Sequence, residues 1–210
     1  LDPSRTRSGA RMNFLAHVYL SPPTADAWLG SLLGDFVKGP VDAAGYNAEI
    51  TAAIRLHRAI DTFTDAHPVV LASKARISPA RRRYAGILVD IFYDHFLASG
   101  WDDHHDAPLE HFSVEVYAEL RMHRHPVPER FAAMAAHLVD DDWFGTYRSI
   151  GGIDTTLARM SRRLRPDAPI RDAVIELEEN YDALREDFRA FIPDLRAAVA
   201  GRIAASARAD

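Results

Sequence analysis

The sequence predicts an all-α fold, a single compact domain of about seven to nine helices, and three observations support this prediction. Apolar residues recur at helical spacing along most of the 210-residue chain, as they do on the buried face of an amphipathic helix. Residue types that begin or end helices separate these runs from one another. The alternating pattern of β-strands is almost absent, and only residues 13–20 would fit a short strand.

The expected helices follow in order from these signals. Thr24 is suited to cap a helix over residues 25–38, which Gly39 and Pro40 would end. A long amphipathic helix is expected from about Asn47 to Ala66. Further helices are expected to begin at Pro68 and to cover residues 79–98, 108–123, 129–139, 155–164 and 170–200, the last bent or interrupted at Pro193.

The domain is expected to span residues 12–200, with no internal repeat and no low-complexity linker. Met12 opens an apolar segment, so residues 1–11 are interpreted as a disordered extension or a remnant of cloning. Residues 201–210 are polar and rich in alanine, and we expect them to form a frayed tail.

Composition excludes several classes of protein. The chain has 25 Lys and Arg against 30 Asp and Glu, a net charge of −5, which argues against a nucleic-acid-coating protein. It has no cysteine, which excludes disulfides, thiolate zinc sites, iron–sulfur clusters and cysteine nucleophiles. No segment reaches the roughly 18–20 apolar residues of a membrane span, and the start does not match a secretory signal. We therefore expect a cytoplasmic protein whose metal sites, if any, use histidine and carboxylate ligands.

The segment RLHRAIDTFTDAHP, residues 55–68, is the first that carries candidate chemistry. His57, Asp61 and Asp65 are spaced four residues apart, so consecutive side chains of a helix would lie about 5–6 Å from each other. At that distance an imidazole and a carboxylate can share a metal ion or orient one another for proton transfer. The alternative is a surface His–Asp pair that contributes only a few tenths of a kcal/mol.

The segment VDIFYDHFL, residues 89–97, is apolar nearly all round, as in a buried helix. It nevertheless contains Asp90, Asp94 and His95. Two unpaired carboxylates there would cost several kcal/mol, so they need a cation. Because no Lys or Arg lies between Gly86 and Asp102, that cation must be a metal ion or come from another helix.

Two more polar side chains interrupt apolar segments: Asp35 in SLLGDFVKG and His17 in FLAHVYL. Taken alone, His17 fits a hydrogen-bonded core histidine better than a ligand. Together, the acids and histidines predict a site for Mn²⁺, Mg²⁺ or Fe²⁺, which prefer oxygen and imidazole ligands. Such a site is suited to phosphoester hydrolysis. The His104, His105 and Asp106 loop lacks helical spacing and is interpreted as exposed.

Four motifs together resemble the acyl carrier protein phosphodiesterase family: MNFLAHVYL (12–20), GSLLGDFVKG (30–39), IRLHRAIDTFTDAHP (54–68) and LVDIFYDHFLASGW (88–101). A weaker similarity continues to about residue 200. The resemblance implies removal of 4′-phosphopantetheine from holo acyl carrier protein, with a Mn²⁺-type requirement. It also implies a fold that diverged from the HD-domain metal phosphohydrolases.

The resemblance further implies that five residues lie at the site: Asp35, His57, Asp61, Asp94 and His95. HD enzymes carry an adjacent His-Asp doublet, whereas here the order is reversed to Asp94-His95. The reversal leaves open whether His95 binds metal, orients the phosphate or packs.

From the residues and the resemblance together, we expect each site residue to have a role. His57, Asp61 and Asp94 are the expected metal ligands, and Asp35 is a further ligand or the base for the attacking water. His17 or His95 would donate a proton to the leaving serine oxygen. Asp65 and Asp90 are expected to orient these groups or the substrate.

Docking of an acidic carrier protein to a net-negative chain needs local basic patches. One patch has no acid between residues 67 and 89 and contains Lys74, Arg76, Arg81, Arg82 and Arg83. A second, with Asp167 and Asp172 as its only acids, contains Arg159, Arg162, Arg163, Arg165 and Arg171. The alternative is that both patches are solvated helix faces.

Two other functions fit the same residues. An HD-like phosphohydrolase could use the metal motifs on a nucleotide or another small phosphoester. A non-enzymatic helical adaptor could instead pair its buried acids with Arg55, Arg58 or other arginines. An adaptor is expected to contain no metal and to be indifferent to a chelator.

Overall fold

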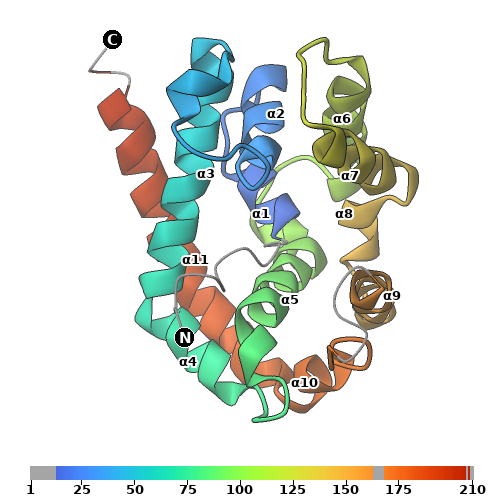
Figure 1. Ribbon diagram of the computed structural model, residues 1–210. Helices are drawn as coiled ribbons and strands as arrows, with labels where there is room; N and C mark the ends of the chain where they lie inside the picture. Colours follow the sequence, from blue (N-terminus) through green and yellow to red (C-terminus); the bar gives the residue numbers. More distant parts are fainter. Residues whose placement is uncertain (1–12, 163–167, 207, 209–210) are drawn as a thin grey trace, which may run out of the picture.

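The computed structural model describes residues 13–162, 168–206 and 208, and within these residues it contains helices and no strand (Figure 1). The all-α prediction is confirmed, and eight of the eleven α-helices in these residues have seven or more residues. The α-helices are α1 (Phe14–Tyr19), α2 (Ala25–Leu33), α3 (Ala48–Ala66), α4 (Pro68–Arg76), α5 (Ala85–Ser99), α6 (Leu109–Met122), α7 (Glu129–Asp140), α8 (Trp143–Thr146), α9 (Ile150–Ser161), α10 (Val174–Glu179) and α11 (Tyr181–Ser206). Short 3₁₀ turns are η2 (Val41–Ala44), η3 (Arg82–Tyr84) and η4 (Trp101–Asp103).

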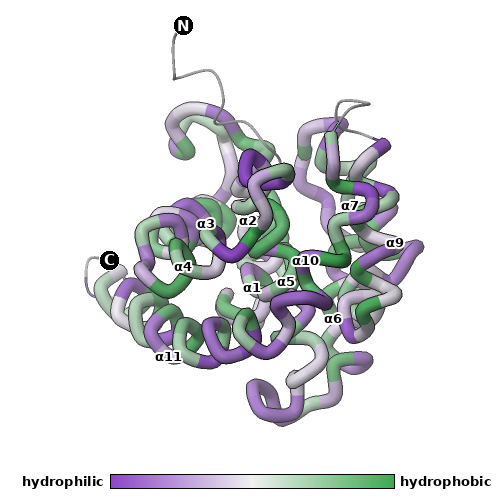
Figure 2. The backbone as a smooth tube through the Cα atoms, turned by 90° about the horizontal axis from the view of Figure 1, so that it is seen from below, coloured by the Kyte–Doolittle hydropathy of each residue, from purple (hydrophilic) through white to green (hydrophobic). Residues whose placement is uncertain are grey.

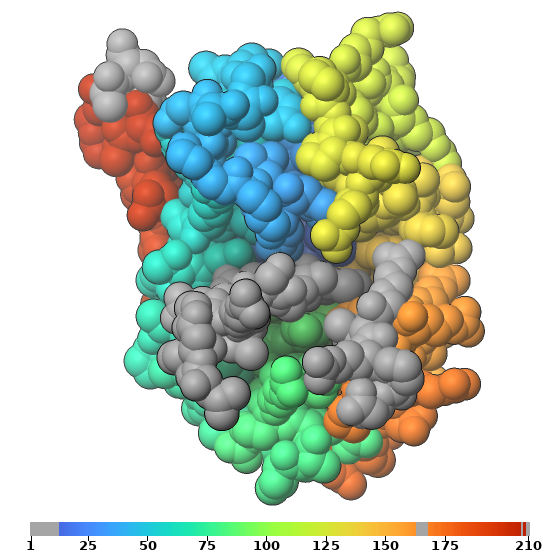
Figure 3. Space-filling model, viewed as in Figure 1, coloured from blue at the N-terminus to red at the C-terminus, as the bar shows by residue number. Residues whose placement is uncertain are grey.

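Helices α1 and α5 lie near the middle of the molecule. Helices α3, α4 and α11 pack on one side of them, and α6, α7 and α9 lie on the other (Figures 1 and 2). Eleven of the fifteen residues of α5 are buried, as its apolar sequence predicts. On the face shown in Figure 3, the blue residues of α2 adjoin the yellow residues of the α6–α7 region, so segments far apart in sequence meet there.

Local sequence signals set most helix starts. The Thr24 hydroxyl accepts a hydrogen bond from the Ala27 amide, and the Asn47 side chain accepts one from the Ile50 amide. Helix α2 ends at Leu33, five residues before its predicted end, because the amides of Phe36 and Val37 turn back to the Leu33 carbonyl. That turn carries Asp35 toward α3.

Residues 13–20, the only candidate strand, form the short helix α1 instead. A helix of six residues is not stable alone. It forms here because Phe14, Leu15 and Val18 are buried and because a side chain from α5 binds its first amides.

Helices α2 and α3 approach one another closely at Gly30. A Cβ atom at this position would lie 2.6 Å from the Ile50 carbonyl oxygen and 2.7 Å from the Ala53 Cβ. A larger residue would force the two helices apart, so Gly30 fixes the spacing between them.

The last part of the chain differs from the prediction in two ways. The break between helices falls at Asn180, and α11 continues through Pro193, whose ring is exposed while Phe188, Phe191 and Leu195 are buried. Residues 201–206, expected to fray, continue α11. The segment 1–11 lies outside the described residues.

None of the described helices combines the length and the apolar character needed to span a bilayer.

Candidate active site

His17 of α1 and His57 and Asp61 of α3 meet in the interior, with one ligand atom from each within 4.8 Å of the others. The His17 Nε2 lies 3.2 Å from Asp61 Oδ1, and the His57 Nε2 lies 3.4 Å from Asp61 Oδ2. The two imidazole rings stack, with centroids 3.8 Å apart and an interplanar angle of 17°. Both histidines are buried, and the Asp61 side chain is 14% exposed. We call these three residues the His–Asp cluster.

Backbone contacts fix the orientation of His57. Its Nδ1 lies 2.6 Å from the Ser31 carbonyl oxygen of α2, which can only accept, so Nδ1 donates and Nε2 faces the carboxylates. Gly34, one turn after Gly30, makes room for the ring, because a Cβ at position 34 would lie 2.2 Å from two ring carbons.

Asp94 fixes the position of His17 through the backbone of α1. Its two carboxylate oxygens accept hydrogen bonds from the Leu15 and Ala16 amides, each at 3.0 Å. These amides belong to the first turn of α1, where backbone N–H groups have no acceptor within the helix. Asp94 is fully buried, and burial raises its pKa well above its ordinary value although the two amides oppose the shift.

The cluster holds its histidines in different charge states. Burial, and the proximity of His57, lower the pKa of His17 to about 4, so this imidazole is neutral at pH 7. Burial also lowers the pKa of His57, but Asp35 and Asp61 outweigh it and raise the pKa to about 9. Burial favours the protonated form of Asp61, but its contacts with the two histidines outweigh this and depress its pKa.

The donor set fits a divalent cation. His17 Nε2 and His57 Nε2 are buried, and although both lie near Asp61, neither forms a hydrogen bond of acceptable geometry within the described residues. The protonated His57 supplies the positive charge that the carboxylates need, and a metal ion would replace that proton. Two imidazoles and a carboxylate match the ligand preferences of Mn²⁺ and Fe²⁺.

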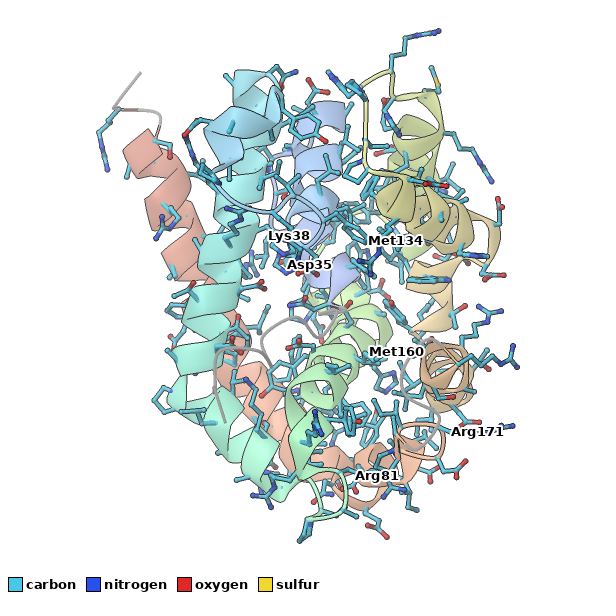
Figure 4. The ribbon with its side chains drawn as sticks, in the orientation of Figure 1. Asp35, Lys38, Arg81, Met134, Met160 and Arg171 are labelled. Carbon is cyan, nitrogen blue, oxygen red and sulfur yellow. The ribbon has the colours of Figure 1, made fainter. Side chains whose placement is uncertain are left out.

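Asp35 lies beside the cluster, with its Oδ1 3.7 Å from His57 Nε2 and its side chain 23% exposed. It does not belong to the set whose atoms all lie within 4.8 Å of one another. In Figure 4, Asp35 and Lys38 lie just below α2, across from Met134 of α7 and Met160 of α9. The Asp35 side chain is thus more exposed than that of Asp61, which is 14% exposed.

Besides Asp35, four predicted site residues are not part of the His–Asp cluster. Asp94 binds the α1 amides, which disagrees with its predicted role as a metal ligand. His95 is buried, with Nδ1 2.8 Å from the Tyr147 carbonyl oxygen and Nε2 3.1 Å from the Tyr181 hydroxyl. Both of its nitrogens thus have protein partners, and burial lowers its pKa, so it packs between helices.

Asp65 is exposed and pairs with Lys74 at 2.8 Å, and Asp90 is half-buried on α5.

The first basic patch is largely neutralised within the fold. Arg81 pairs with buried Glu176 at 3.0 Å and donates to the carbonyl oxygens of Pro169 and Asp172. Lys74 and Arg76 pair with Asp65 and Asp187. Arg82 and Arg83 remain exposed.

The second basic patch is partly free. Arg159 pairs with Asp141 at 3.2 Å, whereas Arg162 and Arg171 are exposed. Arg163 and Arg165 lie outside the described residues.

The arginines considered for an adaptor do not neutralise the cluster. Arg55 pairs with Asp42, and Arg58 donates to the carbonyl oxygens of Val37 and Gly39. Asp61 and Asp35 instead face histidines.

Ser31 and Gly34 act on the site without having been predicted to do so. The signal for Gly34 was the spacing GSLLG, which places two glycines one turn apart on the face of α2 that meets α3. No signal in the sequence identified Ser31, because its contribution is a backbone carbonyl.

Comparison with known proteins places the sequence among relatives of one family. Residues 12–195 match the model of a family described as acyl carrier protein phosphodiesterase. Relatives that carry that name include one from Photorhabdus laumondii subsp. laumondii, 33% identical over 87% of this chain and 92% of the relative; one from Yersinia enterocolitica, 34% identical over 87% and 94%; and one from Salmonella dublin, 36% identical over 90% and 98%. No solved structure matches the chain, so the relation to HD domains stays a prediction. The family match and these relatives together place the chain in the acyl carrier protein phosphodiesterase family.

Proposed function

We propose that this protein is a metal-dependent acyl carrier protein phosphodiesterase. It hydrolyses the phosphodiester between 4′-phosphopantetheine and the serine of the holo carrier protein, and it releases the apo protein. The observation that carries the proposal is the His–Asp cluster, in which two buried imidazoles and a carboxylate converge from α1 and α3 with imidazole nitrogens left without good partners.

The residues that would hold the ion are His17, His57 and Asp61, with Asp35 adjacent. Mn²⁺ is the first candidate, and Mg²⁺ and Fe²⁺ suit the same ligand types. The chemistry that such an ion supplies, when bound, is polarisation of a phosphoryl oxygen and activation of water at neutral pH.

The two histidines are suited to metal binding by their hydrogen bonds and burial. The Ser31 carbonyl holds the Nδ1 proton of His57, which leaves the Nε2 lone pair for a ligand. His17 is kept neutral by burial, so it is a ligand and not a proton donor near pH 7. His95 takes no part, because both of its nitrogens are bound elsewhere.

Asp35 is the proposed base, since it is the more exposed carboxylate beside the cluster. It accepts a proton from the attacking water as the water oxygen forms a bond to phosphorus. The bond from phosphorus to the serine oxygen breaks, and Asp35 returns the proton to that oxygen. The products are the serine hydroxyl of the apo carrier and free 4′-phosphopantetheine.

The exposed arginines are the proposed docking residues for the acidic carrier. Arg82 and Arg83 are exposed in the first patch, and Arg162 is exposed in the second, whereas Arg159 pairs with Asp141. Arg81 is excluded because its guanidinium is committed to Glu176.

The decisive experiment incubates purified protein with Mn²⁺ and holo carrier protein and measures the carrier by mass spectrometry. We expect the loss of the 4′-phosphopantetheine mass, which a chelator should prevent. Asp61→Asn and Asp35→Asn should each reduce turnover by about a hundredfold or more while keeping the helical circular dichroism spectrum. Asp65→Asn is the matched control, because it removes the same charge from an exposed position of α3.

Three outcomes would contradict the proposal. Full turnover by Asp61→Asn would remove the cluster from the reaction. An unchanged carrier mass combined with hydrolysis of a nucleotide would favour the small-molecule phosphohydrolase, and metal-free protein indifferent to chelator would favour the adaptor.

Metal binding can be tested without activity. Saturating Mn²⁺ should raise the melting temperature of the wild type by about 5 °C or more, because an ion that binds only the folded state stabilises it. Asp61→Asn should lose the shift, and Asp65→Asn should keep it. An equal shift in all three proteins would place the ion elsewhere.

A further inference from the structure

A pocket separate from the His–Asp cluster lies between the end of α5 and α11. Its volume is about 750 Å³, within the range of roughly 300–1,000 Å³ that ligand sites occupy. Its walls include the aromatic rings of Phe96, Tyr181 and Phe188, and none of its lining residues belongs to the His–Asp cluster.

One wall of the pocket is a row of three arginines. Arg185, Arg189 and Arg196 are four and seven residues apart on α11, close to whole helical turns, so they share one face over about 16 Å. The pocket also contains His104, and among the described residues that line it Asp103 is the only acid. The pocket is therefore electropositive although the chain as a whole is acidic.

Two of these arginines have no protein partner among the described residues. Arg185 pairs with Asp182 at 2.9 Å and lies over the Tyr181 ring. Within the described part of the chain, Arg189 and Arg196 form no ion pair and no side-chain hydrogen bond, in contrast to Arg76 and Arg81. Neither guanidinium stabilises the fold through such a contact.

The pocket and the cluster lie on opposite sides of α1. His17 faces Asp61, whereas the Tyr19 hydroxyl donates to the backbone carbonyl of His104 at 3.2 Å. Side chains two residues apart on a helix point about 160° away from each other. A ligand in the pocket is thus separated from the catalytic cluster by a helix.

We propose that this pocket binds a phosphate-bearing small molecule, with its phosphate on Arg189 and Arg196 and its apolar part against the aromatic rings. Guanidinium groups bind phosphate oxygens in pairs of parallel hydrogen bonds, and a row of them suits a ligand with more than one negative charge. Flat apolar ligand groups pack on aromatic rings in such sites. The concave, aromatic-walled shape favours a small molecule over an acidic protein surface.

Calorimetric titration in the presence of a chelator tests the proposal, because the chelator removes any contribution from a metal ion at the cluster. The probes are adenosine diphosphate, 4′-phosphopantetheine and inorganic phosphate, with adenosine as the probe that lacks phosphate. We expect one of the two organic phosphates to bind more tightly than inorganic phosphate and adenosine, and which one binds identifies the source of the ligand.

Variants locate the binding. The double variant Arg189→Ala and Arg196→Ala should weaken binding at least about tenfold, since two charged contacts are lost. The matched control, Arg202→Ala with Arg208→Ala, removes the same charge from positions that do not line the pocket and should bind as the wild type does. Ser99→Trp keeps the arginines but fills the pocket from its exposed edge, and it should also abolish binding.

Three results would overturn the proposal. They are the absence of binding by every organic phosphate, equal weakening in both double variants, and unaffected binding in Ser99→Trp. A Kd for the carrier protein that rises in Arg189→Ala with Arg196→Ala, without any organic phosphate binding, would make the row a protein-docking surface instead. None of these results depends on turnover, so they do not test the proposed function.

Discussion

Single residues on α2 decide whether His57 can occupy its position. Gly34 has ordinary helical backbone angles, so glycine is not needed there for conformational freedom. It is needed because the His57 ring fills the space where a Cβ would be. The contact couples the packing of α2 on α3 to the geometry of the site.

Gly34→Ala should therefore damage stability and activity together. The added methyl group displaces the His57 ring, which should cost about 1–3 kcal/mol in the free energy of unfolding. A shift of about 1 Å in the ring should also reduce turnover by roughly a hundredfold. Urea unfolding and the carrier mass assay measure the two effects.

Gly201→Ala is the control for this substitution, because a Cβ at position 201 of α11 meets nothing within 4 Å. It should stabilise the protein by up to about 1 kcal/mol and leave turnover unchanged. Wild-type turnover in Gly34→Ala would show that the His57 ring position is not required.

At the scale of elements, α1 depends on α5 for its existence. The helix is short, and its first amides are bound by a carboxylate 78 and 79 residues later in the chain. A buried acid that the sequence indicated as a metal ligand instead places the helix that carries His17. Asp94 is a positioning residue.

Asp94→Asn tests this role. An amide side chain has one acceptor oxygen where the carboxylate has two, so one α1 amide loses its partner. We expect a loss of about 1–3 kcal/mol in unfolding free energy and a lower Mn²⁺ affinity as His17 shifts. Asp102→Asn, at an exposed position after α5, should change neither. Mn²⁺ affinity lost with no change in stability would instead favour direct ligation by Asp94.

The link between α10 and the segment before α5 predicts a pH effect on stability. Buried Glu176 accepts hydrogen bonds from the Ser78 amide and from Arg81, and it also contacts the Ser78 hydroxyl. Burial alone would raise the pKa of Glu176, but these bonds outweigh it and lower the pKa. The group therefore stabilises the fold above its unfolded pKa of about 4.3, and the stabilisation is lost as the pH falls through the lower, folded pKa.

Glu176→Gln should be less stable than the wild type by about 1–3 kcal/mol at pH 7. The difference should shrink on acidification below about pH 4, where the wild-type carboxylate takes up its proton. Urea unfolding of both proteins across this range measures it, and a difference independent of pH would contradict the role of the charged form.

Across the whole molecule, some arginines form ion pairs between helices and others are exposed to solvent. Arg76 and Arg81 hold helices together, whereas Arg83 and Arg162 are exposed on a chain of net negative charge. Long-range attraction for an acidic carrier would come from exposed arginines such as Arg83 and Arg162.

Association with the carrier should accordingly slow as salt is added. The double variant Arg83→Glu with Arg162→Glu should raise KM for holo carrier protein several-fold and leave kcat unchanged, because neither residue touches the His–Asp cluster. Arg202→Glu is the control on α11. A KM that is insensitive to salt in the wild type would argue against electrostatic steering.

Sequence patterns were sufficient to predict the helical class, most helix starts, the burial of α5 and the residue types at the site. These properties depend on contacts within a few turns of one helix: Thr24 and Asn47 bind amides three residues later, and apolar spacing sets which face is buried. The pairing of His57 with Asp61 was likewise predictable from their four-residue spacing.

The tertiary structure alone decided which acids and histidines meet. Spacing along a helix fixes directions within that helix and not the angle at which another helix crosses it. His17 therefore joined the cluster from a segment that resembled a strand, while Asp94 and His95, equally buried, found partners in the Leu15 and Ala16 amides and the Tyr147 carbonyl. Backbone groups carry no signature in the residue types, and for this reason their contribution could be seen only in the folded molecule.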